Sequence, residues 1–150
     1  MSVLFYKELN YLLPIILALL LGGILGWQRV HWHKPAGPRT YALVCAGATL
    51  FTILSLTAFP NDVARVASGI VTGVGFLGAG MIIRREDHVE GLTTAAGLWM
   101  SAAIGMCVGA GYYILAGLTT FLVLILFMFD VNGREAEKTV KKRISRLPPK

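Results

Sequence analysis

Long apolar runs, separated by short polar segments, dominate the pattern of this chain. Five runs are almost free of charged residues: residues 9–27, 40–59, 66–83, 92–109 and 112–129. Each has roughly the 17–25 residues that a helix needs to cross the hydrocarbon core of a bilayer. The pattern predicts an all-α integral membrane protein. Its five transmembrane helices occupy residues 1–130, and a basic tail follows over residues 131–150.

Composition and charge support this class and predict an orientation. Apolar residues make up 55% of the chain and charged residues 15%, whereas a soluble domain carries about 25% charged residues. With five spans, one membrane surface holds most of the Lys and Arg residues, and the other holds only Lys7 and Arg65. The positive-inside rule then places the N-terminus outside and the C-terminus in the cytoplasm. The net charge of +6 is a topology signal, and nothing else in the sequence supports binding to nucleic acid.

A literal G-x-G-x-x-G motif occupies residues 73–78 of the third run. A dinucleotide site needs a strand before this motif and an amphipathic helix after it, but here apolar residues continue on both sides. We therefore interpret the glycines of the first, third and fourth runs as close-packing positions between helices. The expected positions are Gly22, Gly26, Gly69, Gly73, Gly75, Gly78, Gly80, Gly97 and Gly105. They predict a compact bundle of these three helices with the third at its centre, and a fifth helix that faces lipid.

Charged residues near the helix ends are candidate functional positions. Arg29, Arg39 and Arg84 lie at the predicted cytoplasmic ends of the first three spans, where they can form one cluster. Asp62 and Arg65 lie at the opposite surface. They form either a helix cap with a structural ion pair or, if Arg65 points inward, a functional charge.

Three polar or aromatic residues belong to the fourth span. We expect Thr93 and Thr94 to cap this helix, because threonine hydroxyls accept hydrogen bonds from free backbone N–H groups at a helix start. Trp99 lies deeper than an interfacial residue, so its indole N–H is expected to have a buried partner.

The sequence contains no recognisable catalytic or metal-binding set. It has no Ser/His/Asp or Cys/His arrangement and no pair of carboxylates inside a span, so we expect neither an enzyme nor a bound cofactor. His31 and His33 are close in sequence, but the only other histidine is His88. Zinc needs three or four ligands, so these residues do not predict a zinc site. The tail either forms a basic helix on an anionic membrane surface or is solvated.

Two segments carry a family resemblance: GWQRVHWHKPAGPRTYALVCAGATLF and DVARVASGIVTGVGFLGAGMIIRREDHVEGLTTAAGLWMSAAIGMCVGAGYY. Over about residues 22–128 they resemble the bacterial MgtC/SapB family. The resemblance implies a multi-pass protein of the bacterial inner membrane, linked to growth at low magnesium and to virulence. It also implies that the best-known members act by restraining the ATP synthase. The charged positions matched to the family are Arg29, Arg39, Asp62, Arg65 and Arg84.

The chain also departs from the family pattern. Gln28 stands where the family usually has Glu, Pro38 where it has Leu, and Gly69 where it has Gln. It resembles a short form without the soluble C-terminal domain of the longer members.

From these observations we predict a protein that modulates other membrane proteins. The alternative is a transporter or channel component for Mg²⁺ or another ion, which the lack of carboxylates inside the spans disfavours. An enzyme of lipid or envelope metabolism, with phosphates bound by the arginines, is a third alternative. The expected partners are membrane lipids and other membrane proteins, and a homo-oligomer such as a dimer is left open.

Overall fold

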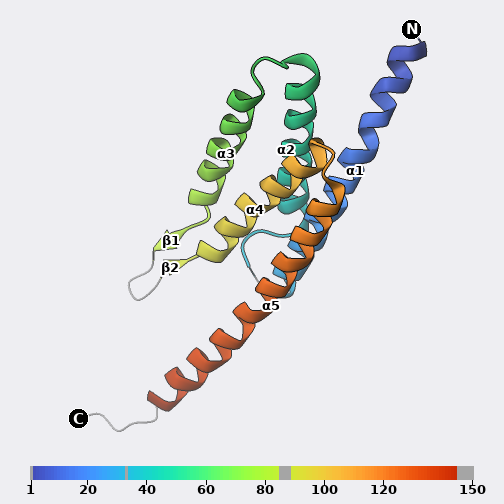
Figure 1. The fold of residues 1–150 in the computed structure, drawn as a ribbon. Coiled ribbons are helices and arrows are strands. Elements are labelled where there is room, and N and C mark those ends of the chain that lie inside the picture. Colours follow the sequence, from blue (N-terminus) through green and yellow to red (C-terminus); the bar gives the residue numbers. More distant parts are fainter. Residues whose placement is uncertain (1, 33, 85–88, 145–150) are drawn as a thin grey trace.

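A computed structural model describes residues 2–32, 34–84 and 89–144, with side chains described for residues 9–32, 34–84 and 89–129. This part of the chain forms five helices and one pair of short strands. In chain order they are α1 (Ser2–His31), α2 (Pro38–Ala58), α3 (Val63–Ala79), β1 (Ile83–Arg84), β2 (Val89–Glu90), α4 (Leu92–Gly109) and α5 (Tyr113–Ile144). The start of α1 and the end of α5 lie at opposite ends of the molecule (Figure 1).

Three of these helices contain segments that are long and apolar enough to cross a membrane. They are Leu9–His31 in α1, Pro38–Ala58 in α2 and Leu92–Gly109 in α4. The helix α3 and the apolar part of α5, Tyr113–Phe129, are shorter. The 17 residues of α3 rise about 26 Å, against a hydrocarbon core of about 30 Å. The protein is thus a helical membrane protein, whereas the crossing of the bilayer by α3 and α5 and the orientation stay predictions.

Two element boundaries differ from those that hydropathy predicts. The first helix continues through the polar residue Gln28 to His31, four residues beyond the apolar run 9–27. The third run is expected to stay helical to residue 83, but α3 ends at Ala79 and β1 pairs with β2 in an antiparallel hairpin. Hydropathy does not detect this end, because Met81, Ile82 and Ile83, which follow the helix, are as apolar as the helix itself. Gly91 has φ 87° after the hairpin, and a Cβ there would collide with the backbone of Met81.

The helices α2 and α4 form the middle of the bundle: α2 packs against α1, α3 and α4, and α4 packs against all four other helices. An added Cβ at Gly22 of α1 would lie 2.8 Å from the Cβ of Cys45 in α2, so only glycine allows this approach. On another side, Gly105 and Gly109 of α4 leave room for the α2 backbone near Cys45 and Thr49. The helices are so close that the Thr49 hydroxyl lies 2.8 Å from the carbonyl oxygen of Gly105, to which it donates a hydrogen bond.

The helix α3 lies at the edge of the bundle (Figure 1). It packs against α2 and α4, and the described residues show no extensive packing between α3 and α1. The prediction of a central third helix packed with the first is therefore wrong, whereas its packing against the fourth is confirmed. Glycine lowers the steric barrier to packing without fixing which helix approaches. Gly78 meets α4, where an added Cβ would lie 3.5 Å from Ala95. The open positions are Gly69, Gly73, Gly75 and Gly80, where an added Cβ would meet no atom of another element within 4 Å.

The helix α5 packs on α1 and α4 along one side only. Ala116, Val123 and Phe127 are buried on this side. The opposite side exposes large apolar residues, among them Ile114, Leu118, Phe121 and Leu122. Such a surface suits contact with lipid, as the sequence predicts. The side chains beyond residue 129, on which the two interpretations of the basic tail depend, lie outside the described part.

Candidate functional site

Arg29, near the end of α1, is buried inside the bundle with 1% of its surface exposed. Its Nη2 atom donates a hydrogen bond of 3.3 Å to Oγ1 of Thr94 in α4. Its guanidinium carbon lies 4.4 Å from the centre of the Phe127 ring in α5. A cation is attracted to the negative face of an aromatic ring, more strongly where water is excluded. Arg29 thus joins α1 to α4 and α5.

Tyr41 adds α2 to the same set of contacts. Its side chain is fully buried, and its hydroxyl donates a hydrogen bond of 3.3 Å to the carbonyl oxygen of Thr94. Its ring meets the Phe127 ring edge-on, with 6.5 Å between centroids, and Ser101 of α4 donates a 3.0 Å hydrogen bond to its carbonyl oxygen. We call Arg29, Tyr41, Thr94, Ser101 and Phe127 the Arg29 network. It links α1, α2, α4 and α5 at one end of the bundle.

Gly97 makes room for this network, and Gly26 lets the segment before α2 lie close to α1. At Gly97 of α4 an added Cβ would lie 2.7 Å from Cζ of Phe127 and would also collide with the Tyr41 hydroxyl. At Gly26 of α1 it would lie 2.6 Å from the carbonyl oxygen of Gly37, just before α2. Gly26 and Gly97, together with Gly22 and Gly105, are therefore predicted packing positions that do lie in contacts between elements.

Gln28 lies beside Arg29 in sequence and contacts α5. Its Nε2 atom donates a hydrogen bond of 3.4 Å to the carbonyl oxygen of Leu124. Its Oε1 atom is buried and has no hydrogen-bond partner among the described residues. The family pattern leads one to expect a glutamate here. An ionised glutamate side chain only accepts hydrogen bonds, so it could not donate one to the carbonyl oxygen of Leu124. The amide at position 28 therefore fits this contact.

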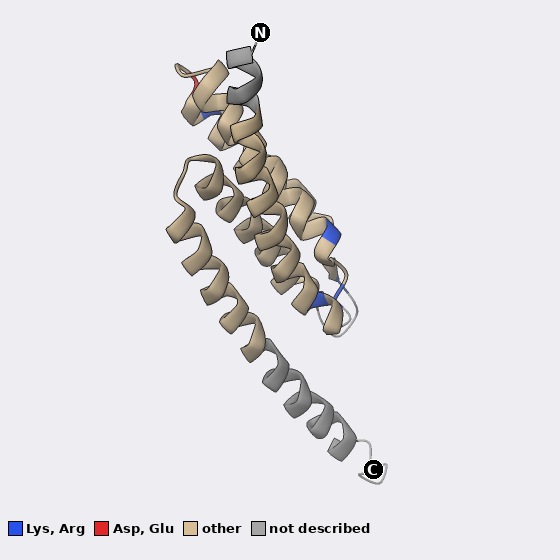
Figure 2. Ribbon diagram, turned by 90° about the vertical axis from the view of Figure 1, so that its right-hand side faces the viewer, with Lys and Arg blue, Asp and Glu red and all other residues tan. Residues whose placement is uncertain are grey.

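The predicted cluster of three arginines does not share one environment. Arg29 is enclosed by the bundle, whereas Arg39 at the start of α2 and Arg84 in β1 are exposed. Arg29 is not at the surface, because α1 stays helical past Gln28 and this places the Arg29 side chain beneath the Phe127 ring. In Figure 2 the coloured Lys and Arg positions lie toward the ends of the helices.

The three candidate residues of α4 also differ from the predictions. The helix begins at Leu92 after Gly91, and no side chain caps it. Thr94 therefore lies within the first turn, where it is buried and binds Arg29, and Thr93 is only partly buried. Trp99 is 46% exposed, since it lies on the outer side of α4, so the expectation of a buried indole is wrong.

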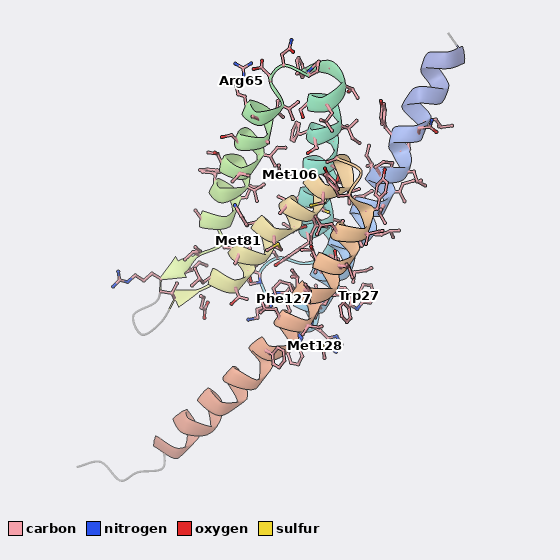
Figure 3. All side chains as sticks on the ribbon, in the orientation of Figure 1. Trp27, Arg65, Met81, Met106, Phe127 and Met128 are labelled. Atoms are coloured by element: carbon pink, nitrogen blue, oxygen red, sulfur yellow. The ribbon has the colours of Figure 1, made fainter. Side chains whose placement is uncertain are left out.

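Asp62 and Arg65 form an ion pair at the opposite end of the bundle. Arg65 Nη2 lies 2.6 Å from Asp62 Oδ2, with the side chains 80% and 48% exposed. The Asp62 side chain makes no capping hydrogen bond to α3. Arg65 lies at the end of α3 remote from Phe127 (Figure 3). Of the two interpretations, the structure favours a surface pair over an inward-facing charge.

A polar cavity of about 340 Å³ lies beside the Arg29 network, lined by Lys34, Glu90, Thr93 and Thr94 among others. Among the described side chains, no three His, Cys, Asp or Glu residues gather in a group able to hold a metal ion. His33 and His88 lie outside the described residues. Cys45 and Cys107 are both free thiols.

Tyr41 and Phe127 are network members that the sequence reasoning missed. A signal for Tyr41 is present, because Tyr41, Cys45, Thr49 and Thr52 recur at helical spacing and all four are buried in α2. No comparable signal marks Phe127, since it stands among the other large apolar residues of α5.

The model of the MgtC family matches residues 15–132, which include all five members of the Arg29 network. The chain belongs to the MgtC family. It is 42% identical over 138 residues to "Protein MgtC" of Salmonella typhimurium, an alignment that covers 92% of this chain and 57% of that protein. No solved structure matches the chain.

Two further relatives extend the comparison. "Putative magnesium transporter YhiD" of Escherichia coli K12 is 41% identical over 130 residues, covering 79% of this chain and 60% of that protein. "Protein MgtC" of Brucella abortus is 45% identical over 108 residues, covering 71% and 45%. The chain thus spans about half to three fifths of the length of these MgtC-family relatives.

Proposed function

We propose that this chain is a multi-pass protein of the bacterial inner membrane that modulates another membrane protein during adaptation to low magnesium. The link to magnesium rests on its family relatives, one of which is named as a transporter of that ion. We further propose that a helix of the partner docks on one side of α3. This surface, the α3 outer face, consists of Ser68, Thr72, Gly75 and Ala79.

The observation that carries this proposal is that the α3 outer face is exposed. An added Cβ at Gly75 would meet no atom within 4 Å. The hydroxyl of Thr72 donates a hydrogen bond of 2.9 Å to the carbonyl oxygen of Ser68, so its polar hydrogen is already satisfied within the helix. Small residues on a membrane helix let a second helix approach closely and gain van der Waals contact. Gly22, Gly26, Gly97 and Gly105 are used in contacts within the bundle, whereas Gly75 on this face is available to a partner.

Ion transport is the second candidate, and the name of the Escherichia coli relative favours it. Its physical difficulty lies in the Arg29 network. A permanently charged guanidinium, hydroxyl groups and an aromatic ring occupy the buried polar region, whereas Mg²⁺ is bound through carboxylates and other oxygen ligands. A buried positive charge also repels a divalent cation.

The docking proposal is tested with Gly75→Leu and the matched substitution Gly117→Leu in α5, where an added Cβ likewise meets no atom within 4 Å. Both proteins are expressed in a bacterium that lacks its own MgtC-family gene, and growth at low magnesium is measured at equal protein level. We expect Gly75→Leu to abolish growth rescue and Gly117→Leu to retain it. A photo-reactive residue at position 75, but not at 117, should crosslink to one membrane protein. Full rescue by Gly75→Leu would rule out docking on the α3 outer face.

The transport alternative needs a separate measurement. The purified protein is placed in liposomes and the uptake of Mg²⁺ is followed with an internal indicator. We expect no uptake above that of empty liposomes. Saturable uptake that is abolished by Asp62→Asn would contradict the proposed modulation and support transport instead.

A further inference from the structure

An apolar groove runs between α2 and α3. Its volume is about 580 Å³, within the range of roughly 300–1,000 Å³ typical of ligand pockets. Every residue that lines it is apolar or glycine. Its walls include Leu43, Gly47 and Phe51 from α2 and Gly69, Gly73 and Leu77 from α3.

Missing side chains create this groove. At Gly47, Gly69 and Gly73 an added Cβ would meet no atom within 4 Å, so each glycine leaves space that another residue would fill. The groove lies on the side of α3 opposite Gly75, because positions 73 and 75 point in nearly opposite directions at 3.6 residues per turn. It is therefore distinct from the α3 outer face. Within a bilayer, an elongated apolar groove of this kind suits a hydrocarbon chain.

Positive charge lies at one end of the groove. Arg39 precedes Leu43 by four residues on α2, so it lies one turn away on the same side of the helix. The antiparallel helix α3 reaches the same end with Leu77, and Arg84 follows in β1. Arg39 and Arg84 are exposed, and neither side chain forms a hydrogen bond or ion pair with another described residue. At the other end, Arg65 is already paired with Asp62.

We propose that the groove binds an anionic phospholipid, with one acyl chain between α2 and α3 and the headgroup phosphate on Arg39. A guanidinium binds a phosphate through two parallel N–H···O bonds, which gives both strength and orientation. The free positive charge at one end selects the direction in which the lipid lies. A lipid with net negative charge is preferred because no ammonium group of its own competes with Arg39. This site goes beyond the proposed docking of a partner helix.

The test uses the full chain in nanodiscs that contain equal amounts of phosphatidylglycerol and phosphatidylcholine. A trace of either lipid carries a photo-reactive group on its acyl chain, and mass spectrometry maps the labelled peptides. We expect phosphatidylglycerol to label the Leu43–Phe51 and Gly69–Leu77 segments preferentially. Arg39→Gln should reduce this preference by about tenfold, as expected for the loss of a charge-assisted hydrogen bond, and Arg39→Lys should restore part of it.

Two glycine substitutions separate this site from the docking face. Gly73→Phe fills the groove and should abolish labelling by both lipids, whereas Gly75→Leu on the other side of α3 should leave it unchanged. Thermal unfolding that matches the unsubstituted protein shows that each variant is folded. Equal labelling by the two lipids that Arg39→Gln does not change would overturn the proposal. So would a crosslink from position 73 to a second copy of the chain in place of lipid.

Discussion

The guanidinium carbon of Arg29 lies 4.4 Å from the centre of the Phe127 ring, so a charge from the first helix is covered by an aromatic residue from the last. An arginine within a membrane domain is costly unless other groups compensate for the water it loses. Phe127 and Thr94 provide part of that compensation from two other helices. The contact therefore holds the first helix, α1, against the last helix, α5.

Phe127→Ala should destabilise the protein by about 3–5 kcal/mol, the usual cost of removing a buried Phe side chain. The substitution removes the ring from Arg29 and from Tyr41 and leaves a cavity between four helices. Thermal unfolding in detergent measures the loss. The control is Phe121→Ala on the outer side of the same helix, where the ring is 60% exposed and the effect should be small. Equal melting temperatures for the two variants would contradict this account.

Thr94→Val should cost about 1–3 kcal/mol, because it keeps the shape of the side chain but removes the acceptor of an Arg29 hydrogen bond. Thr93→Val is the neighbouring control, since Thr93 is partly buried and its side chain makes no hydrogen bond with another described residue. Chemical unfolding of both variants in the same detergent compares them directly. A Thr93→Val variant that is as unstable as Thr94→Val would show that the hydrogen bond to Arg29 contributes little.

Gly105→Leu should prevent normal assembly of the bundle, and Gly73→Leu should not. An added Cβ at Gly105 would collide with the Cys45 carbonyl oxygen and lie 3.0 Å from the Cβ of Ala48, whereas at Gly73 it would meet nothing within 4 Å. Even Gly105→Ala should destabilise the protein by about 1–3 kcal/mol. Native gel mobility and thermal unfolding test all three variants. The sequence alone predicts the same loss for both leucine substitutions, so equal disruption would support a central α3.

The C-terminus should lie in the cytoplasm and the segment around Asn61 outside it, because most of the Lys and Arg residues then lie inside. Fusions of alkaline phosphatase and of a fluorescent protein at Lys150 and after Asn61 measure this. We expect fluorescence from the first position and phosphatase activity from the second. The reverse pattern would invert the orientation, and the same reporter active at both positions would show that an even number of spans separates the two positions.

The family and the helical class were accessible from sequence, because each depends on local information. Apolar runs of sufficient length define α1, α2 and α4. The two segments that resemble the family lie within the residues 15–132 that the family model matches. Individual packing glycines such as Gly22 and Gly105 were also predicted correctly. Gly73 was predicted as a packing position by the same rule and does not pack, because spacing shows where a helix can be approached and not whether a neighbour is there.

The sequence by itself determined that the chain is a membrane protein, since the apolarity of a segment and its length are properties of the segment alone. Only the tertiary structure decided that α2 and α4 form the centre, that Arg29 lies under Phe127 and that α3 keeps one face and one groove open. These features depend on which helices pack together. That choice is made by the sum of many weak contacts between residues far apart in sequence, which no local pattern records.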